Sequence, residues 1–593
     1  MRLTDEREAF AIAQTHGIAE PIARILAGRG VSVDDAPDYL APSLKTSLPD
    51  PSHLLDMDKA VARTVDAILA GKRITVFGDY DVDGATSAAL LMRYMREIGA
   101  DMLAYIPDRM KEGYGPNITA FDTLIEKGTS LIITVDCGTL AYAPIAHAKA
   151  RGVDVIVLDH HTAEATLPEA YAVVNPNRLD ETSMHRNLAA VGVTFLFLVG
   201  LNRRLRECNF FCHSSQAKRE LESSAVEVMD SCVRRNDKTI TEPNLMTLLD
   251  IVALGTVADV VTLKGLNRVL VAQGLKVMAA RGNVGLRALA DVARMDETPS
   301  TYHLGHLLGP RINAGGRVGQ SDLGLKLLIE EDEGVAAEMA AQLNLYNAER
   351  QAIEASVLEQ AMAMADAQAN MPVILLSREG WHQGVIGIVA GRIKERFGRP
   401  CAVVALDSGM GKASARSVAG ADFGAAVHQA HALHLIEQGG GHAMAAGFSV
   451  RAEKIEALHH FFCERMASAV SDYQAGRVLK LDGWISASGA TLELLELIDR
   501  AGPYGAGNAR PTFGLRDVQV VKRTVMKEKH LRLILADAGG KGRLTAVAFN
   551  VADTPLGQAL ATRHRLHVAG ELKRNLWQGE QSVQLIIEDV AWD

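Results

Sequence analysis

The stretch KRITVFGDYDVDG, residues 72–84, decides how the first half of this chain folds. A short, β-branched apolar run ends at Phe77 and is soon followed by Asp79, Asp81 and Asp83. Such a run, bounded by turn residues, predicts a buried strand. In an open α/β sheet, ligands bind at the carboxyl ends of the strands. We therefore expect these carboxylates to line a ligand-binding crevice.

The same pattern recurs twice further along the chain. LIITVD, residues 131–136, ends on Asp136, and VDVIVLDHH, residues 153–161, ends on one aspartate and two histidines. Parallel strands would bring these groups to one crevice, and oxygen ligands mixed with imidazole suit two Mg²⁺ or Mn²⁺ ions that clamp a phosphoryl displacement. If the last stretch continues as a strand, His160 and His161 face opposite sides. One would then bind metal, while the other contacts phosphate or moves a proton.

Two other interpretations of the acidic stretch are weaker. DYDVDG, residues 79–84, matches the first half of a calcium-binding EF-hand loop. That loop needs a glutamate at its twelfth position, where this chain has Leu90, and it follows a helix rather than a strand. A solvated acidic turn is the remaining alternative.

Length and composition indicate a soluble, multidomain protein. The chain has 593 residues, enough for about three or four domains, and its net charge of −9 argues against a non-specific nucleic-acid coat. The longest uncharged apolar stretch, Leu188 to Leu201, is shorter than the roughly 18 residues of a membrane span, and the N-terminus lacks a secretory signal. Six scattered cysteines fit the reducing cytoplasm. Of these, Cys208, Cys212 and Cys232, with His213, could hold zinc, but the spacing is imperfect and incidental cysteines are the simpler interpretation.

Strand and helix patterns divide the chain into five parts. We predict an α/β fold with a doubly wound parallel sheet, a long connecting helix, a second α/β unit and a C-terminal antiparallel barrel. In chain order, the parts are an N-terminal helical extension (1–50), the parallel-sheet unit (51–333, with a charge-rich helical insertion at 202–246), the connecting helix (334–370), the second α/β unit (371–468) and the barrel (469–593).

Three glycine-containing or hydroxyl-rich stretches are candidate phosphate sites. GPRINAGGRV, residues 309–318, reads as a glycine-rich loop with two arginines, which match phosphate oxygens. GGGHAMAAG, residues 439–447, would expose backbone N–H groups at a helix start. GKASARS, residues 411–417, adds hydroxyls and cations on a loop. An ordinary turn and a flexible hinge are the alternatives for the first two.

Together, these motifs resemble the RecJ branch of the DHH phosphoesterase superfamily, from about residue 50 to the end. The matching stretches, in order, are GDYDVDG (78–84), VDCG (135–138), DHH (159–161), LGTVADV (254–260), PRINAGGR (310–317), WHQGVIGIVA (381–390), GGGH (439–442), PYGAGN (503–508) and QL (584–585). So many matches in one order make chance agreement very unlikely.

The resemblance implies a single-strand-specific DNA exonuclease that works from 5′ to 3′, releases mononucleotides and serves repair and recombination. It also implies two Mn²⁺ or Mg²⁺ ions, a C-terminal OB-fold and, as partners, a single-strand-binding protein and a helicase. By resemblance, the metal ligands are Asp79, Asp81, Asp83, Asp136, His160 and Asp259, with His161 beside the scissile phosphate. In such a fold the strand before Asp136 would lie between the other two ligand-bearing strands, so Asp136 is the candidate bridging ligand. The strand would be contacted by Arg311, Asn313, Arg317, Ser414, Arg416, Gly440, Gly441 and His442.

Three positions leave questions open. Trp577, between basic residues of the barrel, is a candidate platform for base stacking, or else a barrel-core residue. Pyrophosphatase relatives carry a metal-binding histidine where this chain has Phe77, so the ligand set of one ion is open. Ala415 replaces a glycine of related sequences.

Three rival functions follow from the same superfamily. An oligoribonuclease or cyclic-dinucleotide phosphodiesterase would not need the C-terminal barrel. A non-catalytic DNA-binding scaffold for replication would have lost metal ligands, whereas this chain keeps its carboxylates. A pyrophosphatase is disfavoured by Phe77 and by the extra domains.

Overall fold

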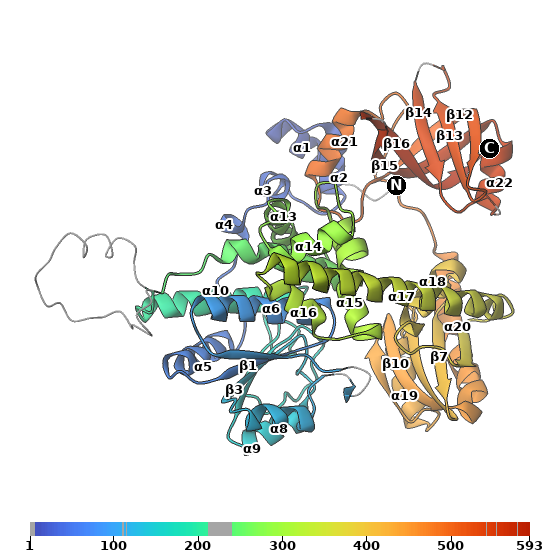
Figure 1. Cartoon of the computed structure of the whole chain (residues 1–593). Helices are drawn as coiled ribbons and strands as arrows, with labels where there is room; N and C mark the ends of the chain where they lie inside the picture. The colour runs from blue at the N-terminus through green and yellow to red at the C-terminus, as the bar shows by residue number, and fades with distance from the viewer. Residues whose placement is uncertain are drawn as a thin grey trace, which may run out of the picture.

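The computed structural model describes residues 6–108, 112–113, 115–211, 240–540, 542–552, 554–577 and 579–592, and Figure 1 shows how they are arranged. The chain forms a parallel-sheet unit, a second α/β unit joined to it by one long helix, and a C-terminal barrel, as the sequence predicts. Within these ranges, no helix is both long and apolar enough to span a membrane.

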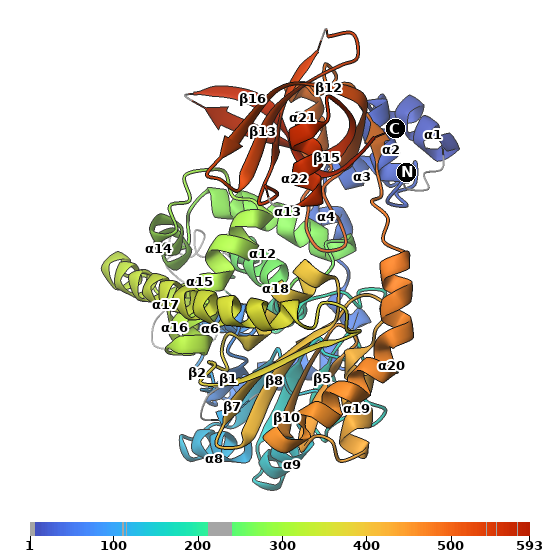
Figure 2. The ribbon, with the colours of Figure 1, turned by 90° about the vertical axis from the view of Figure 1, so that its right-hand side faces the viewer.

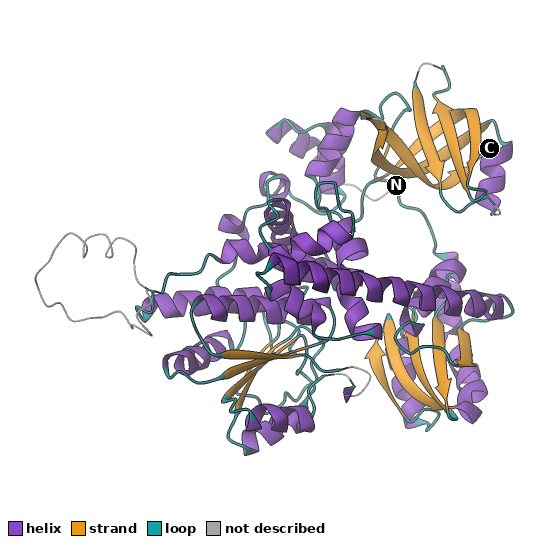
Figure 3. Ribbon diagram, viewed as in Figure 1, coloured by secondary structure: helices purple, strands orange, loops and turns teal. Residues whose placement is uncertain are grey.

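The parallel-sheet unit has the strand order β2-β1-β3-β4-β5, and every neighbouring pair is parallel. Its strands are β1 (Ile74–Gly78), β2 (Met102–Tyr105), β3 (Leu131–Val135), β4 (Asp154–Leu158) and β5 (Ala172–Val174). Helices α5 (Met57–Leu69), α6 (Val82–Glu97) and α10 (Ala190–Glu207) pack on one face, and α8 (Ile118–Glu126) and α9 (Tyr142–Ala150) on the other (Figure 3). Helices on both faces explain why the strands are almost wholly apolar. The three predicted strands are confirmed.

Further helices extend this unit beyond the sheet. They are α12 (Leu249–Ala258), α13 (Gly265–Ala279), α14 (Val284–Val292), the π-helix η3 (His303–Leu308), α15 (Gly309–Val318) and α16 (Leu323–Ile329), with short 3₁₀ turns η1 (Pro51–His53) and η2 (Leu245–Leu248). The insertion predicted at 202–246 begins inside α10, because that helix continues to Glu207. Cys212, His213 and Cys232 lie outside the described residues.

The long helix α17 (Glu333–Asp366) leads to the second α/β unit, and it confirms the predicted connecting helix. The strands are β6 (Ile374–Glu379), β7 (Cys401–Asp407), β8 (Met410–Arg416), β9 (Gln438–His442) and β10 (Ala445–Arg451), in the order β6-β7-β8-β10-β9. Helices α17 and α18 (Ile386–Phe397) cover one face, and α19 (Phe423–Ala432) and α20 (Ile455–Ala475), the latter preceded by the 3₁₀ turn η4 (Ala452–Lys454), cover the other.

The C-terminal part is a closed five-stranded barrel. Its strands run in the order β12-β13-β14-β16-β15, and β15 pairs back onto β12 to close it. They are β12 (Thr512–Met526), β13 (His530–Ala536), β14 (Arg543–Ala548), β15 (Arg565–Trp577) and β16 (Glu580–Ala591), accompanied by β11 (Gly483–Trp484), α21 (Leu492–Arg500) and α22 (Pro555–Thr562). A helix between the third and fourth barrel strands is the OB-fold arrangement, so the predicted barrel is confirmed.

The N-terminal helices pack onto this barrel rather than standing apart. They are α1 (Glu6–His16), α2 (Glu20–Ala27) and α3 (Ala36–Leu40). The next helix, α4 (Leu44–Ser47), packs instead against α13 in the core of the parallel-sheet unit. Ile12 and Ile25 share one hydrophobic core with Leu495 and Phe513 of the C-terminal part. Figure 2 shows the two ends of the chain lying on the same side of the molecule. Residues at the start of the chain therefore help to hold the barrel in place.

Arg268 on α13 joins three parts of the chain. Its guanidinium carbon lies 3.6 Å from the ring centroid of Tyr39, and its Nη2 donates to the carbonyl oxygen of Gly502. The Tyr39 hydroxyl donates to Asn508 Oδ1 at 3.3 Å. Arg268 is 3% exposed, so these contacts are shielded from water. It fixes the N-terminal helices and the loop before the barrel to the parallel-sheet unit.

We expect Arg268→Met to lower the free energy of unfolding by about 2–4 kcal/mol. The change leaves a buried carbonyl without its donor and removes a cation–π contact. A lower midpoint in scanning calorimetry would report the loss. Lys264→Met, at an exposed position beside the start of the same helix, is the control and should leave the midpoint unchanged. Equal midpoints for the two variants would contradict the expectation.

Candidate metal centre

The predicted ligands meet at the carboxyl edge of the parallel sheet. Asp79 directly follows β1, Asp136 directly follows β3, and His160 lies two residues beyond β4. Strand β3 lies between β1 and β4, so Asp136 is central, as expected. Gly84 allows α6 to begin against this edge, because a Cβ there would lie 2.4 Å from the carbonyl oxygen of Asp79.

Donor atoms at this edge form three overlapping sets, each with its atoms within 4.8 Å of one another. The sets are Asp79, Asp81 and Asp136; Asp136, His160 and His161; and Asp83, His160 and Asp259. Asp136 and His160 each belong to two sets. The structure therefore brings all six predicted metal ligands together, and it offers neighbouring cation positions that share ligands.

The buried atoms of this centre fit a cation. His160 Nε2 lies 3.2 Å from Asp136 Oδ1 and 3.6 Å from Asp259 Oδ2. Counting partners among the described residues only, these three atoms are buried with no hydrogen bond. Buried polar atoms left in this way cost free energy. A divalent ion would satisfy them, and carboxylates mixed with imidazole suit Mn²⁺ or Mg²⁺.

Burial and mutual repulsion raise the pKa values of the carboxyl groups in this centre. Burial, reinforced by the charge of Asp81, raises the pKa of Asp83 to about 7. Burial and the charge of Asp83 raise the pKa of Asp259 to about 9. Burial and the charge of Asp81 raise the pKa of Asp136 well above its ordinary value. The metal-free centre therefore retains protons at neutral pH, and a bound cation would displace them.

The two histidines both lie near Asp136, because the strand does not continue through them, which was the condition for opposite faces. Strand β4 ends at Leu158, and the chain has left the strand before His160 and His161. Their ring centroids are 4.7 Å apart, and Nε2 of His160 and Nδ1 of His161 lie 3.2 and 4.0 Å from Asp136 Oδ1. That one imidazole binds metal and the other contacts the substrate phosphate or moves a proton stays a prediction.

Asp159 holds His161 in place. Its Oδ1 accepts a hydrogen bond from His161 Nδ1 at 2.7 Å, and its Oδ2 accepts one from the backbone N–H of Thr139 at 3.0 Å. Burial lowers the pKa of His161, but the bond to Asp159 outweighs it and raises the value to about 9. Burial and the charge of His161 lower the pKa of His160 to about 4, so His160 is a neutral donor at pH 7. Asp159 thus acts on the centre through His161.

We expect the metal-free protein to lose stability as the pH rises from about 6.5 to 9. Asp83 and Asp259 have folded pKa values of about 7 and 9, above the ordinary 3.8, and His161 rises from 6.5 to about 9. Each raised pKa contributes stability that is fully present below the unfolded pKa and is lost as the pH rises from there to the folded pKa, at most about 1.4 kcal/mol per pH unit for each buried carboxyl. Above pH 6.5 the loss therefore comes mainly from Asp259 and His161, because Asp83 has lost most of its share by pH 7. The melting midpoint in EDTA should therefore fall across this range.

Mn²⁺ should remove most of this pH dependence, because a cation replaces the protons. Melting curves at several pH values, with EDTA and with Mn²⁺, measure both effects. Parallel slopes in the two series would contradict the expectation.

Phe77 contributes no ligand. Its ring is fully buried and lies 5.4 Å from the ring centroid of Tyr105 and 5.7 Å from that of Phe121, in the layer between the sheet and α8. Phe77, the residue that departs from the pyrophosphatase pattern, is therefore part of the core between the sheet and the helices α8 and α9.

The stretch predicted as a glycine-rich loop is the helix α15, which corrects that expectation. Its glycines serve close packing: a Cβ at Gly316 would lie 3.0 Å from the carbonyl oxygen of Tyr80. Asn313 Oδ1 accepts a hydrogen bond from the backbone N–H of Val82 at 3.1 Å, so Asn313 supports the acidic stretch. Arg317 Nη1 donates to the carbonyl of Gly384 at 2.8 Å. The helix therefore links the metal centre to the second α/β unit.

Arg311, the other arginine of α15, contacts neither the acidic stretch nor Gly384 in the hydrogen bonds of its side chain. Its Nε donates to Asn344 Oδ1 at 3.0 Å and its Nη1 to the carbonyl of Leu307 at 2.7 Å, so the side chain is held against α17.

Ser414 and Arg416 lie on strand β8, not on the predicted loop. They face the start of α18: a Cβ at Gly387 would lie 2.9 Å from Ser414 Oγ and 3.2 Å from Arg416 Nη2. Arg416 Nη1 donates to Ser414 Oγ at 3.2 Å. A hydroxyl, a guanidinium and a helix N-terminus thus converge, which is the combination that binds phosphate.

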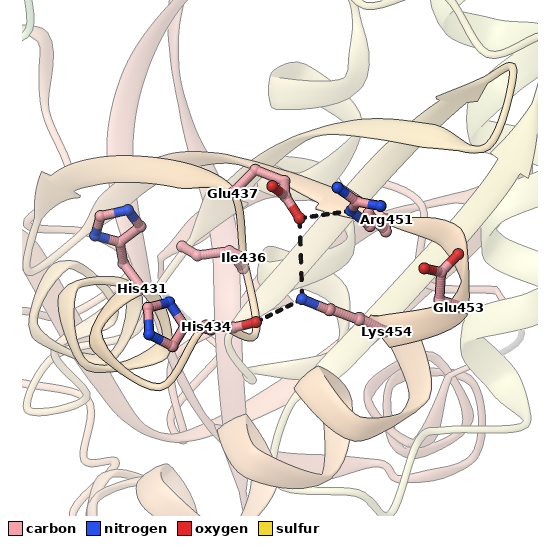
Figure 4. Close-up of a pocket in the computed structure, with 7 residues that line it drawn as sticks. All are labelled: His431, His434, Ile436, Glu437, Arg451, Glu453 and Lys454. Atoms are coloured by element: carbon pink, nitrogen blue, oxygen red, sulfur yellow. Dashed lines mark hydrogen bonds and ion pairs between the residues drawn. The ribbon is translucent and has the colours of Figure 1, made fainter.

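The triple-glycine stretch is the edge strand β9, which corrects the predicted helix start. It pairs with β10, and Gly441, at φ 152°, pairs with Ala446 beside the turn of this hairpin. His442 is exposed at that end of the strand. The pocket in Figure 4, about 330 Å³, lies at the opposite, open end of the hairpin, where Glu437 pairs with Arg451 at 2.8 Å. That pocket is separate from the residues predicted to contact phosphate.

Trp577 is the last residue of β15, and its side chain lies outside the described part of the chain. Sequence reasoning placed Asp159 in the crevice but did not foresee that it holds His161, and it did not foresee the α18 N-terminus beside Ser414. The aspartate directly before two histidines was the available signal for the first. Nothing local in the sequence indicates the second.

Comparison with known proteins agrees with this organisation. The family model of the DHH family, N-terminal domain, matches residues 73–256, the DHHA1 domain matches residues 369–468, and the RecJ OB domain matches residues 481–589. The single-stranded-DNA-specific exonuclease RecJ of Salmonella typhimurium is 35% identical over 98% of this chain and 98% of its own. The protein of that name from Escherichia coli is 34% identical over 96% of this chain and 95% of its own.

Solved structures give the same result. The crystal structure of RecJ in complex with Mn²⁺ from Thermus thermophilus has a TM-score of 0.79 and 29% identity, over 100% of this chain and 79% of that chain. A crystal structure of exonuclease RecJ bound to manganese has a TM-score of 0.57 and 32% identity, over 72% of this chain and 97% of that chain. Full-length similarity, the three matching domains and the shared fold show that this chain belongs to the RecJ family.

Proposed function

We propose that this protein is a metal-dependent exonuclease that hydrolyses single-stranded DNA from 5′ to 3′ into mononucleotides. The observation that carries the proposal is the set of overlapping carboxylate and imidazole donors at the carboxyl ends of β1, β3 and β4. Two Mn²⁺ or Mg²⁺ ions bound there would activate water and neutralise charge on the scissile phosphate. The RecJ relatives named as single-stranded-DNA-specific exonucleases support the choice of substrate.

The chain's own residues have distinct roles in this proposal. Asp136 belongs to two donor sets, which makes it the residue that would hold both ions. Asp79, Asp81, Asp83, His160 and Asp259 complete the ligand sets. His161, held by Asp159 and protonated over most of the neutral range, would contact the scissile phosphate.

The terminal phosphate of the strand would bind beside the second α/β unit. Ser414, Arg416 and the N-terminus of α18 form its site, and Arg317 links that site to the metal centre through Gly384. A site that holds the end of a strand makes the enzyme an exonuclease. Gly440, Gly441 and His442 lie on the edge strand β9, which β10 separates from β8, and would contact the DNA backbone. Roles in DNA repair and recombination, a cytoplasmic location, and partners such as a single-strand-binding protein and a helicase follow from family resemblance.

Digestion of a strand labelled at either end tests the proposal. We expect mononucleotides to leave the 5′ end of the single strand with Mn²⁺, none with EDTA, and little digestion of the matching duplex. Digestion from the 3′ end would reverse the proposed polarity. Tight strand binding without cleavage would favour a non-catalytic scaffold. Cleavage of only dinucleotides or cyclic dinucleotides would favour the phosphodiesterase alternative.

A further inference from the structure

The buried face of the connecting helix α17 becomes polar where the helix passes from one unit to the other (Figure 1). Its buried stripe is apolar up to Leu343, which lies in the core of the parallel-sheet unit. It is apolar again from Val357, which lies in a core of the second α/β unit. Between these two cores, the buried positions hold Asn347, Arg350 and Glu354, which are 4%, 8% and 8% exposed. The polar groups thus mark the junction of the two units.

These polar side chains bond to one another along α17 and reach across to α18. Arg350 Nη2 donates to Asn347 Oδ1 at 2.8 Å, and Arg350 Nη1 donates to Glu354 Oε2 at 2.5 Å. The other carboxylate oxygen, Glu354 Oε1, lies 3.7 Å from Nε of Arg392 on α18. Asn347 therefore orients Arg350, Arg350 orients Glu354, and Glu354 faces α18. We call these four residues the polar relay.

The polar relay suits a role in fixing geometry better than a role in stability. Burying an ion pair costs so much solvation that apolar replacements of similar volume are often as stable or more stable. The Arg392 side chain is 59% exposed, and exposed ion pairs contribute little free energy. Hydrogen bonds between charged groups are directional, however, and they select one arrangement of the groups that they join. The relay therefore fixes how α18 lies against α17.

On the other side of the relay, α17 is fixed to α15. Asn344 Oδ1 accepts a hydrogen bond from Arg311 Nε at 3.0 Å. The ring of Tyr346 packs on the backbone just after α15, because a Cβ at Gly319 would collide with it. Helix α15 in turn supports the acidic stretch of the metal centre through Asn313. A continuous path of contacts thus leads from the metal centre through α15 and α17 to the relay.

Beyond the relay, α18 begins at the candidate phosphate site. Gly387, near the start of this helix, faces Ser414 Oγ and Arg416 Nη2, and Arg392 lies further along the same helix. A shift or rotation of α18 against α17 would therefore move the phosphate site relative to the metal centre.

We propose that the polar relay sets the spacing between the terminal-phosphate site and the metal centre, and so limits the product to one nucleotide. This inference rests on the proposed exonuclease function. The phosphate site would hold the end of the strand, and the metal centre would cut the phosphodiester that lies over it. Successive phosphates are one nucleotide apart, so the spacing between the two sites counts nucleotides. The relay residues touch no substrate in this proposal and act as positioning residues.

The length of the first product tests the proposal. Arg350→Met/Glu354→Leu replaces the buried ion pair with apolar side chains, which should preserve folding. A single strand labelled at its 5′ phosphate is digested with Mn²⁺ in a single turnover, and the labelled products are separated by length. A displacement of about 1 Å can cost 100-fold in rate, so we expect the ratio of dinucleotides to mononucleotides to rise by about 10- to 100-fold. Wild type should release mononucleotides.

Binding measured in EDTA distinguishes altered spacing from damage to the phosphate site. The preference of the full-length protein for a 5′-phosphorylated strand over the same strand with a 5′ hydroxyl should be equal in wild type and in the double variant. Loss of this preference in the variant would place the relay inside the phosphate site and overturn its role in spacing.

Two further variants complete the test. Glu354→Gln keeps an acceptor for Arg350 but removes the charge that faces α18, so it should shift the product ratio in the same direction and decides the matter if the double variant does not fold. Arg204→Met/Glu207→Gln removes an exposed pair on α10 and should leave the ratio unchanged.

Mononucleotides alone from the folded relay variants, mixed lengths from wild type, or an equal shift in the α10 variant would overturn the proposal. If wild type releases no nucleotides from labelled single strands with Mn²⁺, the exonuclease function itself fails, which is a distinguishable result.

Discussion

Asp136→Asn should abolish metal-dependent release of nucleotides from single-stranded DNA, with a rate loss on the order of 10³-fold or more. Asp136 is 2% exposed, lies 3.2 Å from His160 and belongs to two donor sets, so no neighbouring group can take its place. Asparagine is the right replacement because φ at this position is 59°, a left-handed conformation that asparagine adopts more readily than alanine. Single-turnover digestion at saturating Mn²⁺ measures the loss.

The loss should come from chemistry and not from unfolding. The substitution replaces a buried acid, repelled by its neighbours, with a neutral amide. The melting midpoint of the metal-free variant should therefore match or exceed that of wild type at pH 8. Asp250→Asn is the matched control, since Asp250 is also 2% exposed but lies at the far end of α12. Retained turnover in Asp136→Asn, or an equal loss in Asp250→Asn, would remove Asp136 from the mechanism.

Asp159→Asn should lower the rate of digestion by about 10- to 100-fold, the range typical of residues that orient a group at a metal site. Its carboxylate accepts from His161 Nδ1 at 2.7 Å and keeps that imidazole protonated. The pKa of Asp159 itself is lowered: burial opposes ionisation, but the bond and charge of His161 outweigh it. An amide oxygen can still accept this bond but carries no charge, so His161 would be held less strongly and would lose its proton near neutral pH. Single-turnover rates with Mn²⁺ measure the effect.

A double-variant comparison separates positioning from mere structural support. Asp159 also accepts from the backbone of Thr139, so Asp159→Asn should lower stability by about 1–3 kcal/mol in addition. If Asp159 acts through His161, adding Asp159→Asn to His161→Gln should cost little further activity. Fully additive losses, measured well below the melting midpoint of each variant, would contradict this coupling.

The sequence by itself determined the parallel sheet and the edge at which the candidate ligands after β1, β3 and β4 meet, whereas Asp259, at the end of the helix α12, was named from the family resemblance. Apolar runs that end in acidic or imidazole groups have only one favourable arrangement, with the strands buried and the polar groups at their carboxyl ends. β1, β3 and β4 confirm this, and Asp136 is central because β3 lies between the other two. The long helix α17 and the closed barrel also followed from local patterns.

Only the tertiary structure decided where the glycine-rich motifs lie and what they contact. Glycines suit tight turns, strands in close contact and helices packed without a Cβ, so composition alone could not distinguish a loop from α15, β8 or β9. The two histidines share one side because β4 ends at Leu158, a boundary that alternation along a strand does not reveal. The contacts of Arg268, and the meeting of Ser414 and Arg416 with the start of α18, join segments far apart in sequence. Their physical basis is packing between elements, which no local pattern records.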